Sequence, residues 1–113
     1  MPFVSKAATV DEVFRALSDP TRRGVIARLT RSPASVSELA EPFDMALPSF
    51  VQHLRVLESS GLVRSTKSGR VRTYQLVPKR LQVAEHWLAA QRDVWARRMD
   101  RFERYANTME DDQ

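Results

Sequence analysis

Residues 47–76, LPSFVQHLRVLESSGLVRSTKSGRVRTYQL, decide the fold of this chain. Phe50, Leu54 and Leu57 recur at the i, i+4, i+7 spacing that gives a helix one apolar face. Polar side chains fill the other faces, so this segment predicts a helix over about residues 46–60 that packs on one side only.

A basic hairpin is expected directly after this helix. Gly61 is predicted to end the helix as a C-terminal cap, and Leu62 is placed for the hydrophobic contact that accompanies such caps. Residues 62–63 and 71–77 predict two short strands around a turn at Ser68–Gly69. A helix followed by a basic two-stranded wing is the layout of a winged helix-turn-helix DNA-binding domain.

Capping patterns predict three shorter helices upstream. Their expected starts are Thr9 with Glu12, Asp19 with Pro20, and Ser35 with Glu38. The first eight residues are expected to form a loose tail, and a last helix is expected over about residues 79–107. The fold class is therefore mostly α with a small β-hairpin, a winged helix-turn-helix in the order α-α-α-α-β-β-α, built as a single domain over residues 1–113.

The last helix carries a regular apolar stripe. Leu81, Leu88, Trp95, Phe102 and Met109 are spaced by seven residues, a repeat that needs a second helix to cover it. Packing against the chain's own domain is one explanation, but the domain is small for so many aromatic side chains. We therefore expect a homodimer joined through the first and last helices. The expected joint residues are Val13, Phe14, Leu81, Leu88, Trp95 and Phe102.

Positive charge is concentrated on the predicted helix and wing. The net charge of the chain is +4. Residues 21–75 hold nine Arg or Lys against four Asp or Glu, whereas the remainder hold nine against ten. No acidic residue occurs from Ser59 to Ala84. A solvated basic surface would explain the charge alone, but its coincidence with the helix and hairpin favours a polyanionic partner.

Composition excludes several other classes of protein. The chain has no cysteine, so disulfides and thiolate metal sites are excluded. It has no apolar run near 18 residues and no signal-peptide pattern, so we expect a cytoplasmic protein with no membrane span. Three glycines, none in a phosphate-binding loop, and no Ser/His/Asp set or paired carboxylates indicate a protein that is not an enzyme and has no cofactor.

Three segments together resemble a known family. FRALSDPTRRGVIARL (14–29), SVSELAEPFDMALPSFVQHLRVLESSGLV (35–63) and SGRVRTYQL (68–76) are similar to the ArsR/SmtB family of dimeric bacterial winged-helix repressors. The resemblance implies a dimer through the first and last helices. It also implies a repressor that binds double-stranded DNA and whose repression a ligand relieves.

The metal sites of that family are not matched. Ala40 and Pro42 stand where its thiolate site has cysteines, and the last helix has His86 but carries Arg97 near the second histidine position. We therefore expect no metal site. The resemblance supplies no other effector, so an effector, if one exists, stays unidentified, as do the operator and the regulated genes.

The DNA-contact set combines the outer faces of the helix with the wing. It comprises Ser49, Val51, Gln52, His53, Arg55, Lys67, Arg70 and Arg72. Ser49 and Gln52 are expected at base edges, and Val51 against a thymine methyl. His53 has an alternative role in an intramolecular hydrogen bond, and Arg22 and Arg23 are weaker phosphate candidates.

The leading hypothesis is that the chain is a sequence-specific transcriptional repressor. It is expected to bind an imperfect palindrome as a dimer. A non-specific architectural or RNA-binding domain is the first alternative, and discrimination between the palindrome and random duplex separates the two. A protein-binding winged helix is the second alternative, but it has no need of an acid-free basic wing.

Overall fold

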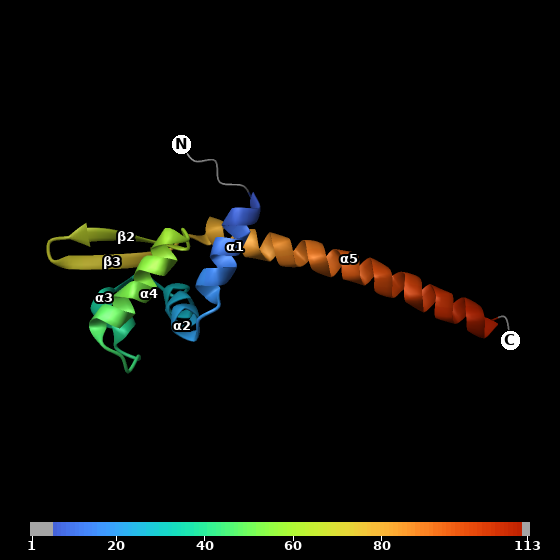
Figure 1. Ribbon diagram of the computed structural model, residues 1–113, viewed down its shortest axis with the longest axis horizontal. Coiled ribbons are helices and arrows are strands. Elements are labelled where there is room, and N and C mark those ends of the chain that lie inside the picture. The colour runs from blue at the N-terminus through green and yellow to red at the C-terminus, as the bar shows by residue number, and fades with distance from the viewer. Residues whose placement is uncertain (1–5, 112–113) are drawn as a thin grey trace.

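Within residues 6–111, which the computed structural model describes, the elements follow the order α-α-β-α-α-β-β-α. They are α1 (Lys6–Leu17), α2 (Pro20–Leu29), β1 (Ala34–Ser35), α3 (Val36–Ala40), α4 (Leu47–Ser59), β2 (Val63–Ser68), β3 (Val71–Leu76) and α5 (Pro78–Asp111). The first four helices and the sheet form one body, from which α5 extends as a single long rod (Figure 1). The molecule measures 75 × 38 × 22 Å. The winged helix-turn-helix prediction is confirmed.

The core lies where α1 to α4 meet the sheet. Phe50, Leu54 and Leu57 are buried, which confirms the predicted inner face of α4. The remaining buried apolar residues are Val13, Ala16, Val25, Ile26, Leu29, Ala34, Leu39, Leu62, Val63, Tyr74 and Ala84. Each large side chain in this set stabilises the fold by about 1.5–3 kcal/mol through loss of apolar surface from water.

Two of the three predicted helix starts are as expected. The Asp19 carboxylate accepts a 3.0 Å hydrogen bond from the backbone N–H of Arg22 at the start of α2. Ser35 and Glu38 form the predicted capping box at α3, with bonds of 3.2 and 3.1 Å. The start at Thr9 is wrong, because α1 already begins at Lys6, where two alanines of high helix propensity follow. Of the expected tail, residues 1–5 lie outside the described part of the chain.

Gly61 ends α4 as predicted. Its φ of 81° lies in the left-handed region, which a residue without a Cβ adopts freely. The N–H of Leu62 donates to the carbonyl of Leu57 at 3.1 Å, and the N–H of Gly61 donates to Glu58 at 3.0 Å. This pair of bonds is a Schellman motif, and the buried Leu62 makes its hydrophobic contact.

The sheet has one strand more than predicted. β1 pairs with β3, which pairs with β2, and all pairs are antiparallel. β1 contains only Ala34 and Ser35, opposite Tyr74 and Thr73, and two residues are too few to show a strand periodicity in the sequence. Its effect is to fasten the start of α3 to the base of the wing. We define the wing as β2 and β3 with the turn at residues 69–70.

α5 is longer than the predicted 79–107. Its 34 residues span about 51 Å at the usual rise of an α-helix. Only its first part packs on the body, where Ala84 is buried and Leu81 is half-buried against the core. Phe14 of α1 meets Trp87 edge-on, with ring centroids 5.6 Å apart. No helix within residues 6–111 combines the length and the apolar content that crossing a bilayer requires.

Candidate nucleic-acid interface

α4 buries one face and leaves the opposite one open to solvent. Ser49, Gln52 and Arg55 are all exposed on that outer face, while Phe50 and Leu54 hold the helix against the body. The amide of Gln52 and the guanidinium of Arg55 take part in no hydrogen bond or ion pair among residues 6–111. Both side chains are therefore available to base edges or phosphates.

The first turn of α4 also faces solvent without a side-chain cap. Ala46 occupies the N-cap position and makes no side-chain hydrogen bond, as its methyl group dictates. Pro48 in the first turn has no N–H, so it lowers the number of unsatisfied donors there. The remaining free N–H groups give this end a partial positive charge, which attracts phosphate.

Val51 lies on the flank of α4 and not on its outermost face. It is half-buried and lines a hollow of about 470 Å³ between α4 and the wing. The other lining residues are Val36, Arg55, Glu58, Arg72 and Tyr74. A thymine methyl would reach Val51 only by entering this hollow.

His53 is engaged inside the protein. Its Nδ1 lies 3.2 Å from Nη1 of Arg22 and 3.6 Å from the carboxylate of Asp19, and the ring is half-buried. The intramolecular role that the sequence left open for His53 is thus the one that the structure displays. The hydrogen bond from the backbone of Arg22 is the main reason that the pKa of Asp19 is lowered, and the nearby His53 adds to this effect.

Arg22 and Arg23 were expected as weaker phosphate contacts, but their guanidiniums cap the end of α1. Arg22 donates to the carbonyls of Ala16 at 2.7 Å and Arg15 at 3.1 Å, and Arg23 donates to Leu17 at 2.9 Å. Cationic donors at the last carbonyls satisfy groups that no helical N–H reaches. These bonds hold both side chains at the end of α1, and their contact with phosphate stays a prediction.

The wing presents its basic residues at the tip. Lys67 faces Arg72 directly across the two strands, and Gly69, with φ 62°, and Arg70 form the turn. Like charges opposite each other destabilise a hairpin, and a bound polyanion would relieve that repulsion. The turn is one residue further along than predicted, because β2 continues through Ser68.

Arg72 differs from Lys67 and Arg70, because its guanidinium is hydrogen-bonded within the wing to a residue that in turn bonds to α4. It donates to the hydroxyl of Ser65 at 2.8 Å, and that hydroxyl donates to Glu58 of α4 at 2.7 Å. This chain of bonds links the wing to α4. Lys67 and Arg70 are exposed and make no such contact in the described part of the chain.

Comparison with known proteins identifies the fold family. A family described as "Helix-turn-helix domain" matches residues 17–66. The chain is 41% identical over 68 residues to the HTH-type transcriptional regulator Rv2034 of Mycobacterium tuberculosis, covering 60% of this chain and 64% of that protein. It is 30% identical over 79 residues to the transcriptional repressor SdpR of Bacillus subtilis, covering 70% of this chain and 88% of SdpR.

A solved structure extends the likeness to most of the chain. The ArsR family transcriptional regulator RHA00566 superposes with a TM-score of 0.77 at 49% identity, over 83% of this chain and 97% of that one. The chain belongs to the ArsR family. It is thus a member of a family of winged helix-turn-helix transcriptional regulators.

At three of the positions that hold metal ligands in the ArsR family this chain has Ala40, Pro42 and Arg97, and α5 has only one histidine, His86. Ala40 ends α3, and Pro42 follows in the turn. His86 and Arg97 are exposed on α5. Within residues 6–111 no group of three or more His, Cys, Asp or Glu side chains lies close enough together to hold a metal ion.

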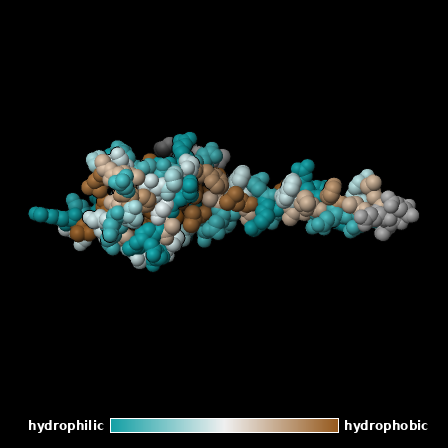
Figure 2. Space-filling model, turned by 90° about the horizontal axis from the view of Figure 1, so that it is seen from below, coloured by the Kyte–Doolittle hydropathy of each residue, from teal (hydrophilic) through white to brown (hydrophobic). Residues whose placement is uncertain are grey.

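The residues expected at an ArsR-type dimer joint divide into two groups. Val13 is fully buried in the core of its own chain, so it cannot touch a partner, and its assignment to the joint is wrong. Phe14 and Leu81 are half-buried against the body. Leu88, Trp95 and Phe102 are 53%, 61% and 66% exposed, although they are large and apolar. In Figure 2 the rod is brown close to the body and carries tan groups among teal ones further out. These apolar side chains have no cover within residues 6–111.

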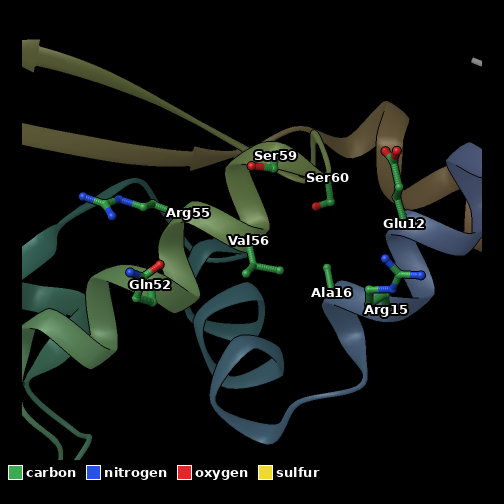
Figure 3. Close-up of a pocket in the computed structure, with 8 residues that line it drawn as sticks. All are labelled: Glu12, Arg15, Ala16, Gln52, Arg55, Val56, Ser59 and Ser60. Carbon is green, nitrogen blue, oxygen red and sulfur yellow. The ribbon is translucent and has the colours of Figure 1, made fainter. Parts of the chain in front are cut away.

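The sequence did not single out one charged residue beside the recognition surface. Arg15 of α1 lines a groove of about 420 Å³ whose other side is α4 (Figure 3). Gln52, Arg55 and Val56 lie on the α4 side of the groove. The available signal was weak, because only the packing of α1 beside α4 brings these segments together.

Proposed function

We propose that this ArsR-family chain is a sequence-specific DNA-binding repressor that occupies an imperfect palindromic operator as a homodimer. The observation that carries the proposal is the outer face of α4, where Ser49, Gln52 and Arg55 are exposed beside a basic wing. A helix of this kind fits the major groove, where each base pair presents a distinct pattern of donors and acceptors.

The side chains of α4 supply direct readout. The amide of Gln52 can pair with both hydrogen-bonding groups of an adenine edge, and the hydroxyl of Ser49 can donate or accept. Arg55 stands one turn further along and can reach a guanine edge or a phosphate. Val51, on the flank of α4, would contact a thymine methyl. His53 contributes by holding α4 in place through Arg22.

The wing supplies affinity more than specificity. Lys67 and Arg70 project from its tip, and Arg72 lies beside Lys67 across the strands. Each cation that meets a phosphate releases condensed counterions, so this contribution to binding weakens steeply as salt rises. Base identity plays no part in it.

The homodimer would form through α5 and the outer side of α1. Leu88, Trp95 and Phe102 form an exposed apolar stripe on α5, and Phe14 and Trp87 begin the same surface beside α1. Water-exposed apolar side chains in this number mark an interaction surface. A two-fold pairing would present two copies of α4 to half-sites one helical turn apart, about 34 Å, or a multiple of that distance.

The proposal also covers where the protein acts, its lack of catalysis, and the kind of effector that it could bind. The protein acts in the cytoplasm as a single-domain regulator without catalytic activity or cofactor. Any effector that relieves repression is not a metal, since the family's ligand positions hold Ala40, Pro42 and Arg97.

Footprinting on genomic fragments tests the proposal directly. The expected result is protection of two half-sites related by approximate two-fold symmetry, with tighter binding there than on random duplex DNA of equal length. Uniform coating of all fragments would contradict specific repression and indicate an architectural protein. No binding to duplex DNA would favour the protein-binding alternative.

A further inference from the structure

A groove between α1 and α4 adjoins the recognition surface. It has a volume of about 420 Å³ and is lined by Glu12, Arg15, Ala16, Gln52, Arg55, Val56, Ser59 and Ser60. In Figure 3, Gln52 and Val56 come from α4 on one side, and Ala16 and Arg15 come from α1 on the other. One wall of the groove is therefore the surface that we assign to base readout.

Arg15 is a free cation on an anchored backbone. Its guanidinium is exposed and takes part in no hydrogen bond or ion pair within residues 6–111. Its carbonyl, in contrast, accepts hydrogen bonds from the Ser18 hydroxyl at 2.6 Å and from Arg22 at 3.1 Å. The helix end that carries Arg15 is thus held in place, while the charge itself is unused.

The lining suits a sugar–phosphate backbone better than a small molecule. Of its lining residues only Ala16 and Val56 are apolar, and Ala16 is fully buried; the other side chains that line it are charged or polar. Small-molecule sites usually enclose most of the ligand in apolar walls, which this groove does not do. The Ser60 hydroxyl is already bonded to the carbonyl of Leu57 at 2.7 Å, so it adds no free donor.

We propose that the DNA-contact surface continues from α4 onto α1, and that Arg15 binds a backbone phosphate of the DNA whose bases α4 contacts. This inference rests on the proposed DNA-binding function. It adds a contact from outside the helix-turn-helix, on the helix that also borders the expected dimer joint. Arg15 would then help to fix the position of α4 along the duplex, because phosphate contacts set register without reading sequence.

Glu12 makes the inference sharply testable, because it lies in the same groove with the opposite charge. Arg15→Gln should weaken binding to the operator and to random duplex alike. The loss of one phosphate contact makes the negative slope of log K against log salt shallower by about 0.9 per protomer. This corresponds to an affinity about fivefold weaker near 0.15 M salt. Glu12→Gln should strengthen both affinities, since it removes a repulsive charge beside the same phosphate.

The measurement is fluorescence anisotropy over a range of salt concentrations, with the footprinted operator and a random duplex. Arg104→Gln is the matched control, because Arg104 is exposed on the far part of α5; it should leave affinity and slope unchanged. A wild-type salt slope for Arg15→Gln overturns the inference, and so does a loss of affinity confined to the operator. If the wild-type protein fails to discriminate the operator from random DNA, the proposed function fails independently of Arg15.

Discussion

The guanidinium of Arg22 lies 3.2 Å from Nδ1 of His53 and joins three helices at one point. It also donates to the carbonyls of Ala16 and Arg15 at the end of α1, while the backbone N–H of Arg22 binds the Asp19 carboxylate that caps α2. His53 belongs to α4, the helix that we assign to the major groove. This one side chain thus links α4 to α1, and through α1 to the expected dimer joint.

Removing the Arg22 side chain should loosen that junction. Arg22→Ala removes the charged donor from the Ala16 carbonyl and from the imidazole of His53, and it removes one of the bonds to the Arg15 carbonyl. Hydrogen bonds to a charged group contribute about 1.5–3 kcal/mol each when lost. The free energy of unfolding, measured by urea denaturation, should fall by an amount in this range or above it. Arg31→Ala is the control, because Arg31 is exposed and its side chain has no bond in the described part of the chain. Equal stability of the two variants would show that the junction is not held by Arg22.

Asp19 should make stability depend on pH in the acid range. Its folded pKa is lowered from 3.8, chiefly by the hydrogen bond from the Arg22 backbone, so the ionised form is favoured by folding. Its contribution is therefore complete above the unfolded pKa and is lost as the pH falls through the folded pKa. Asp19→Asn can still cap α2 but does not titrate there. Urea midpoints between about pH 6 and pH 3 should fall more for the wild type than for this variant; parallel curves would contradict the assignment.

Operator affinity should be indifferent to metals and oxidants. The chain has no cysteine, and its two histidines, His53 and His86, lie on different helices. Zinc, arsenite and peroxide at micromolar concentration should each leave the binding curve unchanged. A tenfold change that a chelator or reductant reverses would refute this prediction and point to a ligand set formed in another way.

The exposed stripe of α5 should join two copies of the chain. Sedimentation at micromolar concentration should give about twice the chain mass of 13.0 kDa. Trp95→Glu or Phe102→Glu would bury an unpaired carboxylate in an apolar joint, which costs several kcal/mol, so the dimer should dissociate and operator binding should be lost. Arg104→Glu also places a carboxylate on α5 but lies outside the seven-residue stripe, and it should stay dimeric. A monomeric wild type, or a dimeric Trp95→Glu protein that binds the operator, would contradict this interface.

The sequence predicted those parts of the fold that depend on local periodicity and capping. The inner face of α4, the Gly61 cap and the Ser35–Glu38 capping box are all as expected. β1 was missed, because its two residues become a strand only through pairing with Tyr74 and Thr73. The start of α1 was misplaced, because a favourable capping pattern at Thr9 does not stop a helix that good helix formers continue upstream.

The candidate site was less predictable than the fold. Gln52 and Arg55 could be placed on the outer face of α4 from the helical period alone. The roles of Arg22, Arg23 and His53 depend on which side chains meet across α1, α2 and α4, and no spacing within one helix encodes that. The helical period of α1 is compatible with Val13 at a dimer interface and with Val13 in the core. In the structure it is buried in the body of its own chain.

The central claim is that α4 reads base sequence while the wing binds backbone. Gln52→Ala and Arg70→Ala separate the two roles, because both residues are exposed and neither is bonded within the described chain. Arg70→Ala should weaken operator and random DNA about equally and flatten the salt dependence.

The most direct test is the ratio of operator affinity to random-duplex affinity for Gln52→Ala, measured at one fixed salt concentration. Loss of base readout should weaken operator binding by about 1–3 kcal/mol and leave random binding nearly unchanged, so the ratio should fall by roughly tenfold or more. A ratio equal to that of the wild-type protein would contradict the assignment of α4 as the recognition helix.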